Sequence, residues 1–251
     1  MSSLLTFEDG WRPRAILFDL DDTLLRSSEA DALALERTVA RFHEAFNGLT
    51  VSQIIEQHAD LLREVRDAYH RTGTWAYPAE RLSRLLARAG GDPSQGALLG
   101  EHYTEARLEA LAPYEGVGEF LEALRAAGLR LGLLSNGSGQ MQRRVLLRFR
   151  LAPYFDPVVL AGEVGLRKPD PAIFEFALGQ MGFRPEEVLM VGDSYALDVL
   201  PALQLGMRAV HVAGGPGDAR SHLFHRPGDP LEGPCTLRVG RVTELAAFLA
   251  R

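Results

Sequence analysis

The sequence predicts an α/β protein, a doubly wound parallel sheet with an inserted α-helical cap. Short apolar runs of strand length alternate with helical patterns along most of the 251 residues. Such alternation is typical of a parallel sheet that is covered by helices on both faces. One long helical stretch after the first apolar run interrupts this alternation and has the size of a small domain. Hydrophobic residues make up 46% of the chain, which is sufficient for a packed core.

Six apolar runs predict the strands of the sheet. They are residues 15–18, 129–134, 158–160, 188–191, 209–212 and 237–239. Helical patterns lie between or after them, at residues 118–127, 139–148, 171–181, 195–205 and 242–249. Because a helix between two strands returns the chain to the same end of the sheet, we expect the strands to run parallel.

Residues 26–112 contain the interrupting helical stretch. Apolar residues recur there at helical spacing, for example at Leu35, Val39, Phe42 and Phe46. We therefore expect an α/β core made of residues 1–25 and 113–251, and a helical cap made of residues 26–112. The Gly/Pro-rich stretch 213–234 precedes the last strand, and the sequence does not indicate its role.

Composition and charge exclude several functional classes. The formal net charge is −6, and a uniformly acidic protein is a poor candidate for binding nucleic acid. Cys235 is the sole cysteine and cannot form an internal disulfide, which favours a reducing compartment. The first residues carry no long apolar run, so neither a secretion signal nor a membrane span is expected. We expect a cytoplasmic protein that acts on a small molecule; its oligomeric state is not readable.

The first polar motif follows the first predicted strand and reads FDLDDT at residues 18–23. Asp19 and Asp21 are two positions apart, so both carboxylates can reach one site if the chain turns there. An aspartate is a competent nucleophile toward phosphorus because it is already ionised at pH 7. A second carboxyl group can protonate a leaving alcohol and later activate water. An Asp-rich turn that merely ends a strand is the alternative for this motif alone.

Two further motifs provide donors and a positive charge. Ser135, Asn136 and Gly137 follow the second strand and open a helix, where hydroxyl, amide and backbone N–H groups can bind phosphate oxygens. Lys168 lies in a proline-rich loop before another helix and suits pairing with a phosphate. Each of these patterns, taken alone, also fits an ordinary exposed turn.

The fourth motif places Gly192-Asp193 after an apolar strand and Asp198 one turn into the next helix. Ligands of open α/β sheets bind at the carboxyl ends of the strands, so these acids should meet Asp19 and Asp21. Two carboxylates about 4 Å apart repel by roughly 4 kcal/mol at an effective dielectric constant near 20. Such a cluster requires protonation or a divalent cation, and an all-oxygen ligand set suits Mg²⁺. The sequence thus predicts a metal-assisted phosphoryl-transfer site.

Together, the four motifs resemble the signatures of the haloacid dehalogenase (HAD)-like hydrolase superfamily, in the phosphatase branch with a helical cap (C1-type). They read FDLDDT at 18–23, LLSNG at 133–137, GLRKPDP at 165–171 and VGDSYALD at 191–198, and they stand in the family's order. The resemblance implies a Rossmann-like core and a mobile cap that closes over the substrate. It also implies a phosphoric monoester hydrolase that acts on a small phosphate monoester through an aspartyl-phosphate intermediate.

The resemblance assigns roles to individual residues. Asp19 would be the nucleophile and a ligand of Mg²⁺, and Asp21 would be the general acid/base, with its backbone carbonyl also facing the metal. Ser135 would hold the transferring phosphoryl group, and Lys168 would stabilise it. The remaining positions support these: Asp193 would be a metal ligand, Asp198 would support the metal waters or the lysine, Thr23 would steady the first loop, and Thr23, Asn136 and Gly137 would line the phosphate site.

Three alternatives remain within the same fold: a 2-haloacid dehalogenase, a sugar phosphomutase and a non-catalytic binding protein. The segments LLSNGS at 133–138 and KPDP at 168–171 also look like dehalogenase sequences. Dehalogenases, however, typically lack the second aspartate of the first motif and the Gly-Asp of the fourth. Halide displacement needs neither a metal nor a proton for the leaving group, so Asp21 and Asp193 favour the phosphatase. The sequence does not name the ester or the cap residues that select it.

Overall fold

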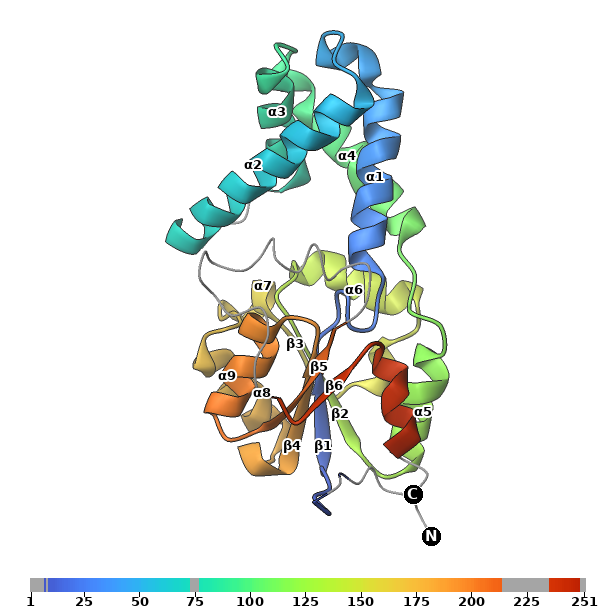
Figure 1. Ribbon diagram of the computed structural model, residues 1–251, viewed down its shortest axis with the longest axis vertical. Coiled ribbons are helices and arrows are strands. Elements are labelled where there is room, and N and C mark those ends of the chain that lie inside the picture. The colour runs from blue at the N-terminus through green and yellow to red at the C-terminus, as the bar shows by residue number, and fades with distance from the viewer. Residues whose placement is uncertain (1–6, 8, 73–76, 214–234, 249–251) are drawn as a thin grey trace. The chain divides into compact units, whose positions relative to one another are not determined.

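The computed structural model describes residues 7, 9–72, 77–213 and 235–248 (Figure 1). Apart from residue 213, the Gly/Pro-rich stretch lies outside the described residues. The described chain forms two compact units. One contains the residues up to 26 and from 113 onward, and the other contains residues 27–112.

A six-stranded parallel sheet forms the centre of the first unit. Its strands are β1 (Ala15–Phe18), β2 (Arg130–Ser135), β3 (Val158–Leu160), β4 (Val188–Gly192), β5 (Arg208–Val212) and β6 (Leu237–Val239). The spatial order is β3-β2-β1-β4-β5-β6, and every neighbouring pair is parallel. The chain winds outward from β1 in both directions, which confirms the predicted doubly wound sheet.

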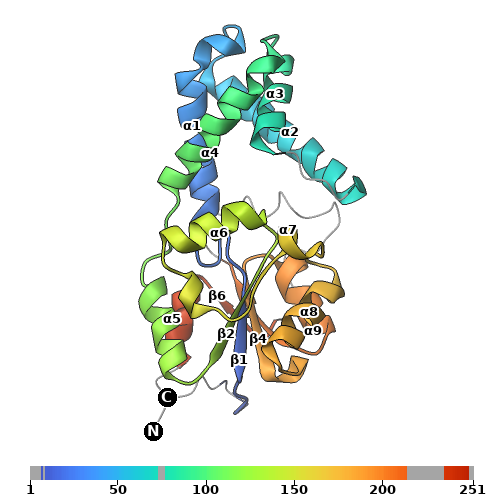
Figure 2. The ribbon, with the colours of Figure 1, turned by 180° about the vertical axis from the view of Figure 1, so that it is seen from behind.

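Helices cover the sheet on two sides (Figures 1 and 2). On one side lies α5 (Val117–Ala126), and on the other lie α8 (Pro171–Met181) and α9 (Leu200–Gln204). Helices α6 (Gly139–Arg148) and α7 (Ala161–Val164) lie toward the carboxyl ends of the strands. Neighbouring side chains on β1 explain the two layers, since successive strand residues point to opposite faces. Leu17 belongs to the apolar cluster that contains Phe174 of α8, whereas the ring of Phe18 lies 6.2 Å from that of Phe120 in α5. Both faces of β1 are therefore buried, as its uninterrupted apolar sequence indicates.

Two segments differ in local form from the predicted helices. The helix expected over residues 195–205 begins with a π-helical segment, Tyr195–Val199, and continues as α9. The helix expected over residues 242–249 is a 3₁₀ helix, Val242–Phe248. The π-helical turn is held by contacts of Ser194 that are described with the site below, and periodicity alone does not reveal them.

The second unit is helical. It consists of α1 (Ser27–Arg41), α2 (Val51–Thr72), α3 (Pro78–Arg88) and α4 (Gly96–Ala110), with 3₁₀ turns at His43–Phe46 and Pro93–Gln95. Its core contains the predicted apolar face, with Leu35, Val39 and Phe46 buried. Helix α4 approaches α3 closely at Gly100, where a β carbon would lie 2.6 Å from backbone atoms of Ala79. No helix in the described part of the chain combines the length and the apolar character needed to cross a bilayer.

Candidate active site

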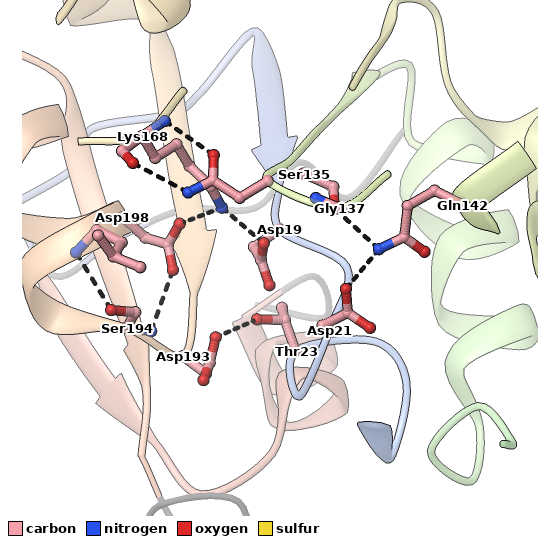
Figure 3. A network of polar contacts seen from close by, with 12 residues as sticks. Asp19, Asp21, Thr23, Ser135, Gly137, Gln142, Lys168, Asp193, Ser194 and Asp198 are labelled. Atoms are coloured by element: carbon pink, nitrogen blue, oxygen red, sulfur yellow. Dashed lines mark hydrogen bonds and ion pairs between the residues drawn. The ribbon is translucent and has the colours of Figure 1, made fainter. Parts of the chain in front are cut away.

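The carboxyl ends of three strands bring the predicted motifs to one edge of the sheet (Figure 3). Asp19 directly follows β1, and its backbone N–H donates to the carbonyl oxygen of Val191 in β4 at 2.9 Å. Ser135 is the last residue of β2, and Asp193 directly follows β4. Because β1 lies between β2 and β4, these three side chains gather at the point where the winding direction of the sheet reverses.

A buried ammonium group lies at the centre of this edge. Lys168 comes from the loop before α8 and is 3% exposed. Its Nζ lies 2.6 Å from Oδ1 of Asp19 and 2.6 Å from Oδ1 of Asp198. The side-chain amide of Asn136 fixes the lysine backbone, because it donates to the Lys168 carbonyl and accepts from the Lys168 N–H, both at 2.9 Å. The lysine is thus held at both ends.

Asp198 reaches Lys168 because the chain is tightly packed around the π-helical turn. Its Oδ2 accepts a hydrogen bond from the backbone N–H of Ser194 at 3.0 Å, and the Ser194 hydroxyl accepts one from the N–H of Leu197 at 3.2 Å. A β carbon at Gly192 would lie only 2.4 Å from Cγ of Asp198. The glycine before Asp193 is therefore required by this close approach, and the Asp198 side chain fills the space that it leaves.

Three carboxylates cluster at this edge, and two of them contact the ammonium group. Asp19, Asp193 and Asp198 each offer an oxygen atom, and these atoms lie within 4.8 Å of one another. Burial raises the pKa of Asp19 to about 7; the charge of Asp198 also raises it, and Lys168 opposes both effects. Burial likewise raises the pKa of Asp193 well above its ordinary value, and the charges of Asp19 and Asp198 add to this. The pKa of Lys168 is raised by the two carboxylates against the effect of burial, so the lysine stays charged.

Asp21 lies in a second, adjoining network with Ser135 and Gln142 (Figure 3). The Gln142 side-chain nitrogen, Nε2, donates to Oδ2 of Asp21 and to the Ser135 hydroxyl, the latter at 3.2 Å. The backbone N–H of Gly137 also donates to that hydroxyl at 3.2 Å. The site therefore combines a carboxylate on a buried lysine, a second carboxylate that is held by an amide, and a hydroxyl with two N–H donors.

Comparison with known proteins identifies the family. Residues 13–206 match the haloacid dehalogenase-like hydrolase family. The chain belongs to this family. A protein of Thermus thermophilus named phosphoserine phosphatase is 36% identical over 259 aligned positions, which cover 94% of this chain and 98% of that protein. A Methanopyrus kandleri protein named glyceraldehyde 3-phosphate phosphatase is 32% identical over 204 positions, covering 80% of this chain and 84% of that protein.

A solved HAD hydrolase has the same fold. The Bacillus subtilis protein YfnB, described as a putative HAD-hydrolase bound to magnesium, superposes with a TM-score of 0.74 at 24% identity. The superposition covers 96% of this chain and 100% of that one. At this identity the likeness supports the fold, and it agrees with the expected Rossmann-like HAD core.

The HAD motifs contribute every residue that the sequence predicts for the site, and all of them lie in the first unit. Thr23 is fully buried, and its hydroxyl donates to Oδ1 of Asp193 at 3.5 Å. The contacts given above for Asn136 and Gly137 are with Lys168 and Ser135. The contacts of Thr23, Asn136 and Gly137 with a substrate therefore remain predictions.

Sequence reasoning missed two residues at this HAD site. Gln142 is 4% exposed and contacts two predicted catalytic residues; its position on the buried face of the α6 pattern was the available signal. His211, in β5, is 2% exposed, and its Nε2 lies 2.9 Å from the backbone oxygen of Asp193. It lies near the carboxyl end of β5, the strand next to β4. Since ligands of open α/β sheets bind at this edge, a polar residue at the end of an apolar strand was the available signal.

The donor set fits the divalent cation that the HAD motifs imply. The three carboxylates of Asp19, Asp193 and Asp198 and the one ammonium group of Lys168 leave two uncompensated negative charges when all are ionised. One Mg²⁺ would balance them, and it prefers carboxylate oxygens together with water. Both carboxylate oxygens of Asp198 accept hydrogen bonds, from Lys168 and Ser194, whereas Lys168 contacts Oδ1 of Asp19, so Asp19 and Asp193 are the better placed side-chain ligands. The predicted contribution of the Asp21 backbone carbonyl stays a prediction.

Proposed function

We propose that this protein is a Mg²⁺-dependent phosphatase that hydrolyses a small phosphate monoester through an aspartyl-phosphate on Asp19. The observation that carries the proposal is the pairing of Asp19, held by buried Lys168, with Asp21, held by the Gln142 amide, at one sheet edge. The two relatives named as phosphatases support the same reaction class.

In the first step, a carboxylate oxygen of Asp19 attacks phosphorus, the new O–P bond forms, and the bond from phosphorus to the ester oxygen breaks. Asp21 gives its proton to the departing alkoxide, which leaves as an alcohol. Lys168 faces the nucleophile and would stabilise negative charge on the transferring group. The Ser135 hydroxyl, with N–H donors on its oxygen, would donate its own proton to a phosphoryl oxygen.

In the second step, Asp21, now ionised, takes a proton from water, and the water oxygen attacks the phosphorus of the aspartyl-phosphate. The bond between phosphorus and the Asp19 oxygen breaks, and inorganic phosphate leaves. Asp21 has regained its proton, and Asp19 has regained its charge. The same carboxyl group therefore acts as acid and then as base.

Asp19, Asp193 and the Asp21 carbonyl are the groups that we propose to hold Mg²⁺. When bound, the cation supplies charge neutralisation that lets a phosphate dianion approach an acidic site. Burial raises the pKa of Asp19 to about 7. A neighbouring divalent charge would favour the ionised nucleophile at neutral pH.

The helical unit has a different proposed role. We assign residues 26–112 as the cap that selects the ester, since the α/β core already contains the groups that act on phosphorus. The proposal places the protein among enzymes of small molecules in the cytoplasm, with no role for nucleic acid or membrane.

Hydrolysis of p-nitrophenyl phosphate by the purified full chain tests the proposal. We expect nitrophenol release that requires Mg²⁺, is lost in EDTA and is abolished by Asp19→Asn. Acid-quenched enzyme should also carry acid-stable phosphate in single turnover with ³²P-labelled ester, and Asp19→Asn should carry none. Full activity of Asp19→Asn would refute the nucleophile assignment.

A negative result with this ester would be followed by two further assays. Chloride release from 2-chloropropionate would identify the dehalogenase alternative. Phosphate release from O-phosphoserine and phosphoglycolate would identify a phosphatase that rejects the aryl ester. The dehalogenase is disfavoured by Asp193, because its half-buried acidic group has no evident use in halide displacement.

A further inference from the structure

Gln142 is a buried polar side chain at the site that the proposed reaction does not yet use. It lies in the first turns of α6, is 4% exposed, and directs its amide nitrogen toward Asp21 and Ser135 (Figure 3). Its carbonyl oxygen, Oε1, is buried and has no hydrogen-bond partner among the described residues. A buried unsatisfied acceptor is destabilising. The fold thus holds this amide in place at a cost, which points to a functional role.

The contact with Asp21 restrains the proposed acid/base. The amide nitrogen of Gln142 donates to Oδ2 of Asp21, so Oδ2 accepts and Oδ1 is the oxygen that would carry the proton of the acid. With Oδ2 of Asp21 bound to Nε2, the carboxyl group cannot rotate about its Cβ–Cγ bond without breaking this hydrogen bond. The amide therefore fixes the direction in which Asp21 presents its proton.

The contact with Ser135 ties the same amide to the phosphoryl-binding group. The Ser135 oxygen receives N–H donors from Gln142 and from the backbone of Gly137, each at 3.2 Å. A hydroxyl oxygen has two lone pairs, and both are directed toward these donors. The Ser135 proton must then point elsewhere, so that one side chain orients two members of the site.

Gly137 provides the space through which Gln142 reaches both partners. A β carbon at position 137 would lie 2.2 Å from Nε2 and 2.6 Å from Cδ of Gln142. No real β carbon tolerates such contacts, so any larger residue would displace the glutamine. The glycine of the LLSNG motif is thereby linked to a residue five positions later in the chain.

We propose that Gln142 is a positioning residue that orients the Asp21 carboxyl group for proton transfer to the leaving group, with Ser135 as its second anchor. This inference rests on the proposed phosphatase reaction. Misorientation of the acid should matter most when the leaving oxygen needs a proton, and least when it departs readily as an anion. The role therefore predicts a leaving-group dependence that general damage to the site would not produce.

Gln142→Met is the main variant, because methionine keeps the length and the helix but removes the amide. The values of kcat/KM are compared for p-nitrophenyl phosphate and phenyl phosphate, which share a ring but differ in leaving-group basicity. We expect a loss of about 10- to 100-fold with phenyl phosphate, the size of one hydrogen bond to a charged group. With p-nitrophenyl phosphate we expect a loss of about threefold or less.

Two further variants distinguish positioning from misfolding. Gln140→Met makes the same change at an exposed position on the same helix and should behave as wild type with both esters. Gly137→Ala displaces Gln142 without altering it and should reproduce the leaving-group dependence. Equal losses with both esters in Gln142→Met, or no loss, would overturn the inference while wild-type turnover still supports the phosphatase.

A readout that needs no turnover tests the contact itself. The side-chain amide signals of Gln142 can be assigned in a ¹⁵N-correlated NMR spectrum by their disappearance in Gln142→Met. Asp21→Asn should shift these signals and leave those of Gln140 in place. An unshifted Gln142 amide would refute the contact, whether or not the protein hydrolyses either ester. A protein that hydrolyses neither ester would instead count against the proposed function for these two substrates.

Discussion

Replacement of Lys168 by methionine tests the charge balance of the site directly. The side chain is 3% exposed, and its ammonium group lies 2.6 Å from one oxygen each of Asp19 and Asp198. Methionine fills most of the volume of the lysine stem but removes the charge. The variant therefore leaves two buried carboxylates beside each other with no counterion.

The expected loss of stability is several kilocalories per mole. At an effective dielectric constant of 20, each contact at 2.6 Å is worth about 6 kcal/mol of gross Coulomb energy, which desolvation of the three charges largely offsets. Removing one partner of a buried ion pair typically costs about 3–5 kcal/mol, and we expect Lys168→Met to cost this much at pH 8 without metal. Burial raises the pKa of Asp19 and Lys168 opposes this, so loss of the lysine should raise that pKa further and let the folded variant bind a proton at a higher pH than its parent. The deficit should therefore shrink as the pH falls toward 6.

Urea unfolding in EDTA measures this cost. A Trp75→Phe background leaves Trp11 as the sole tryptophan, and its indole donates to the carbonyl oxygen of Glu186 at 3.1 Å, so its fluorescence reports on the core. Lys168→Met and Asp198→Asn are measured singly and together. If the ion pair couples them, the double variant loses about 1–3 kcal/mol less than the sum of the single losses. Additive losses, or a Lys168→Met protein within about 0.5 kcal/mol of its parent, would refute the reasoning.

Three further predictions concern backbone space, pH and metal. Gly192→Ala should remove most activity, because a β carbon there would lie 2.4 Å from Cγ of Asp198. The control Gly118→Ala in α5 places its β carbon in open space, so it should stabilise the protein by about 0.5–1 kcal/mol and leave turnover unchanged. A hydrogen bond from the backbone N–H of Arg184 and the nearby arginine side chains lower the pKa of Glu187 to about 2. The contribution of Glu187 to stability is therefore present above pH 4.5 and is lost as the pH falls toward 2. Glu187→Gln should make the free energy of unfolding less dependent on pH in this range, as measured by acid titrations of unfolding. Mg²⁺ at a hundredfold its Kd should stabilise the protein by about 2.7 kcal/mol, seen as a calorimetric shift that EDTA reverses; no shift at saturating Mg²⁺ would count against the metal site.

The sheet was predictable because its strands are encoded locally. The run at Ala15–Phe18 is apolar at every position, as a strand buried on both faces requires, and its predicted and observed bounds coincide. The spatial order of the strands was not predictable from such runs, since each run is compatible with several neighbours. The form of the segment at Tyr195–Val199 was missed for a different reason. Its π-helical turn is supported by hydrogen bonds of Ser194 to Leu197 and Asp198, contacts that a hydrophobic pattern does not contain.

The motif residues were predictable, whereas their supporting residue was not. Asp19, Ser135 and Asp193 each stand at the end of an apolar run, and parallel topology then places them at one edge. Gln142 stands inside a helix, 121 positions from Asp21. Its proposed role depends on the space beside Gly137, where a β carbon would collide with the Gln142 side chain. That the two residues meet is known only from the fold.

The charges at this edge indicate why a lysine is buried between two aspartates. Asp19, Asp193 and Asp198 outweigh Lys168 by two negative charges, and a phosphate dianion would add two more. Without a divalent cation, substrate binding would therefore be opposed by the groups that perform the reaction. If Asp193 holds the proposed cation, the ammonium group of Lys168 would be available to the incoming phosphoryl group, while Asp198 and Asn136 keep the lysine in place. In the proposed reaction, Lys168 would stabilise both the resting fold and the transferring group from a single position, which would account for the contacts that hold its backbone and its side chain.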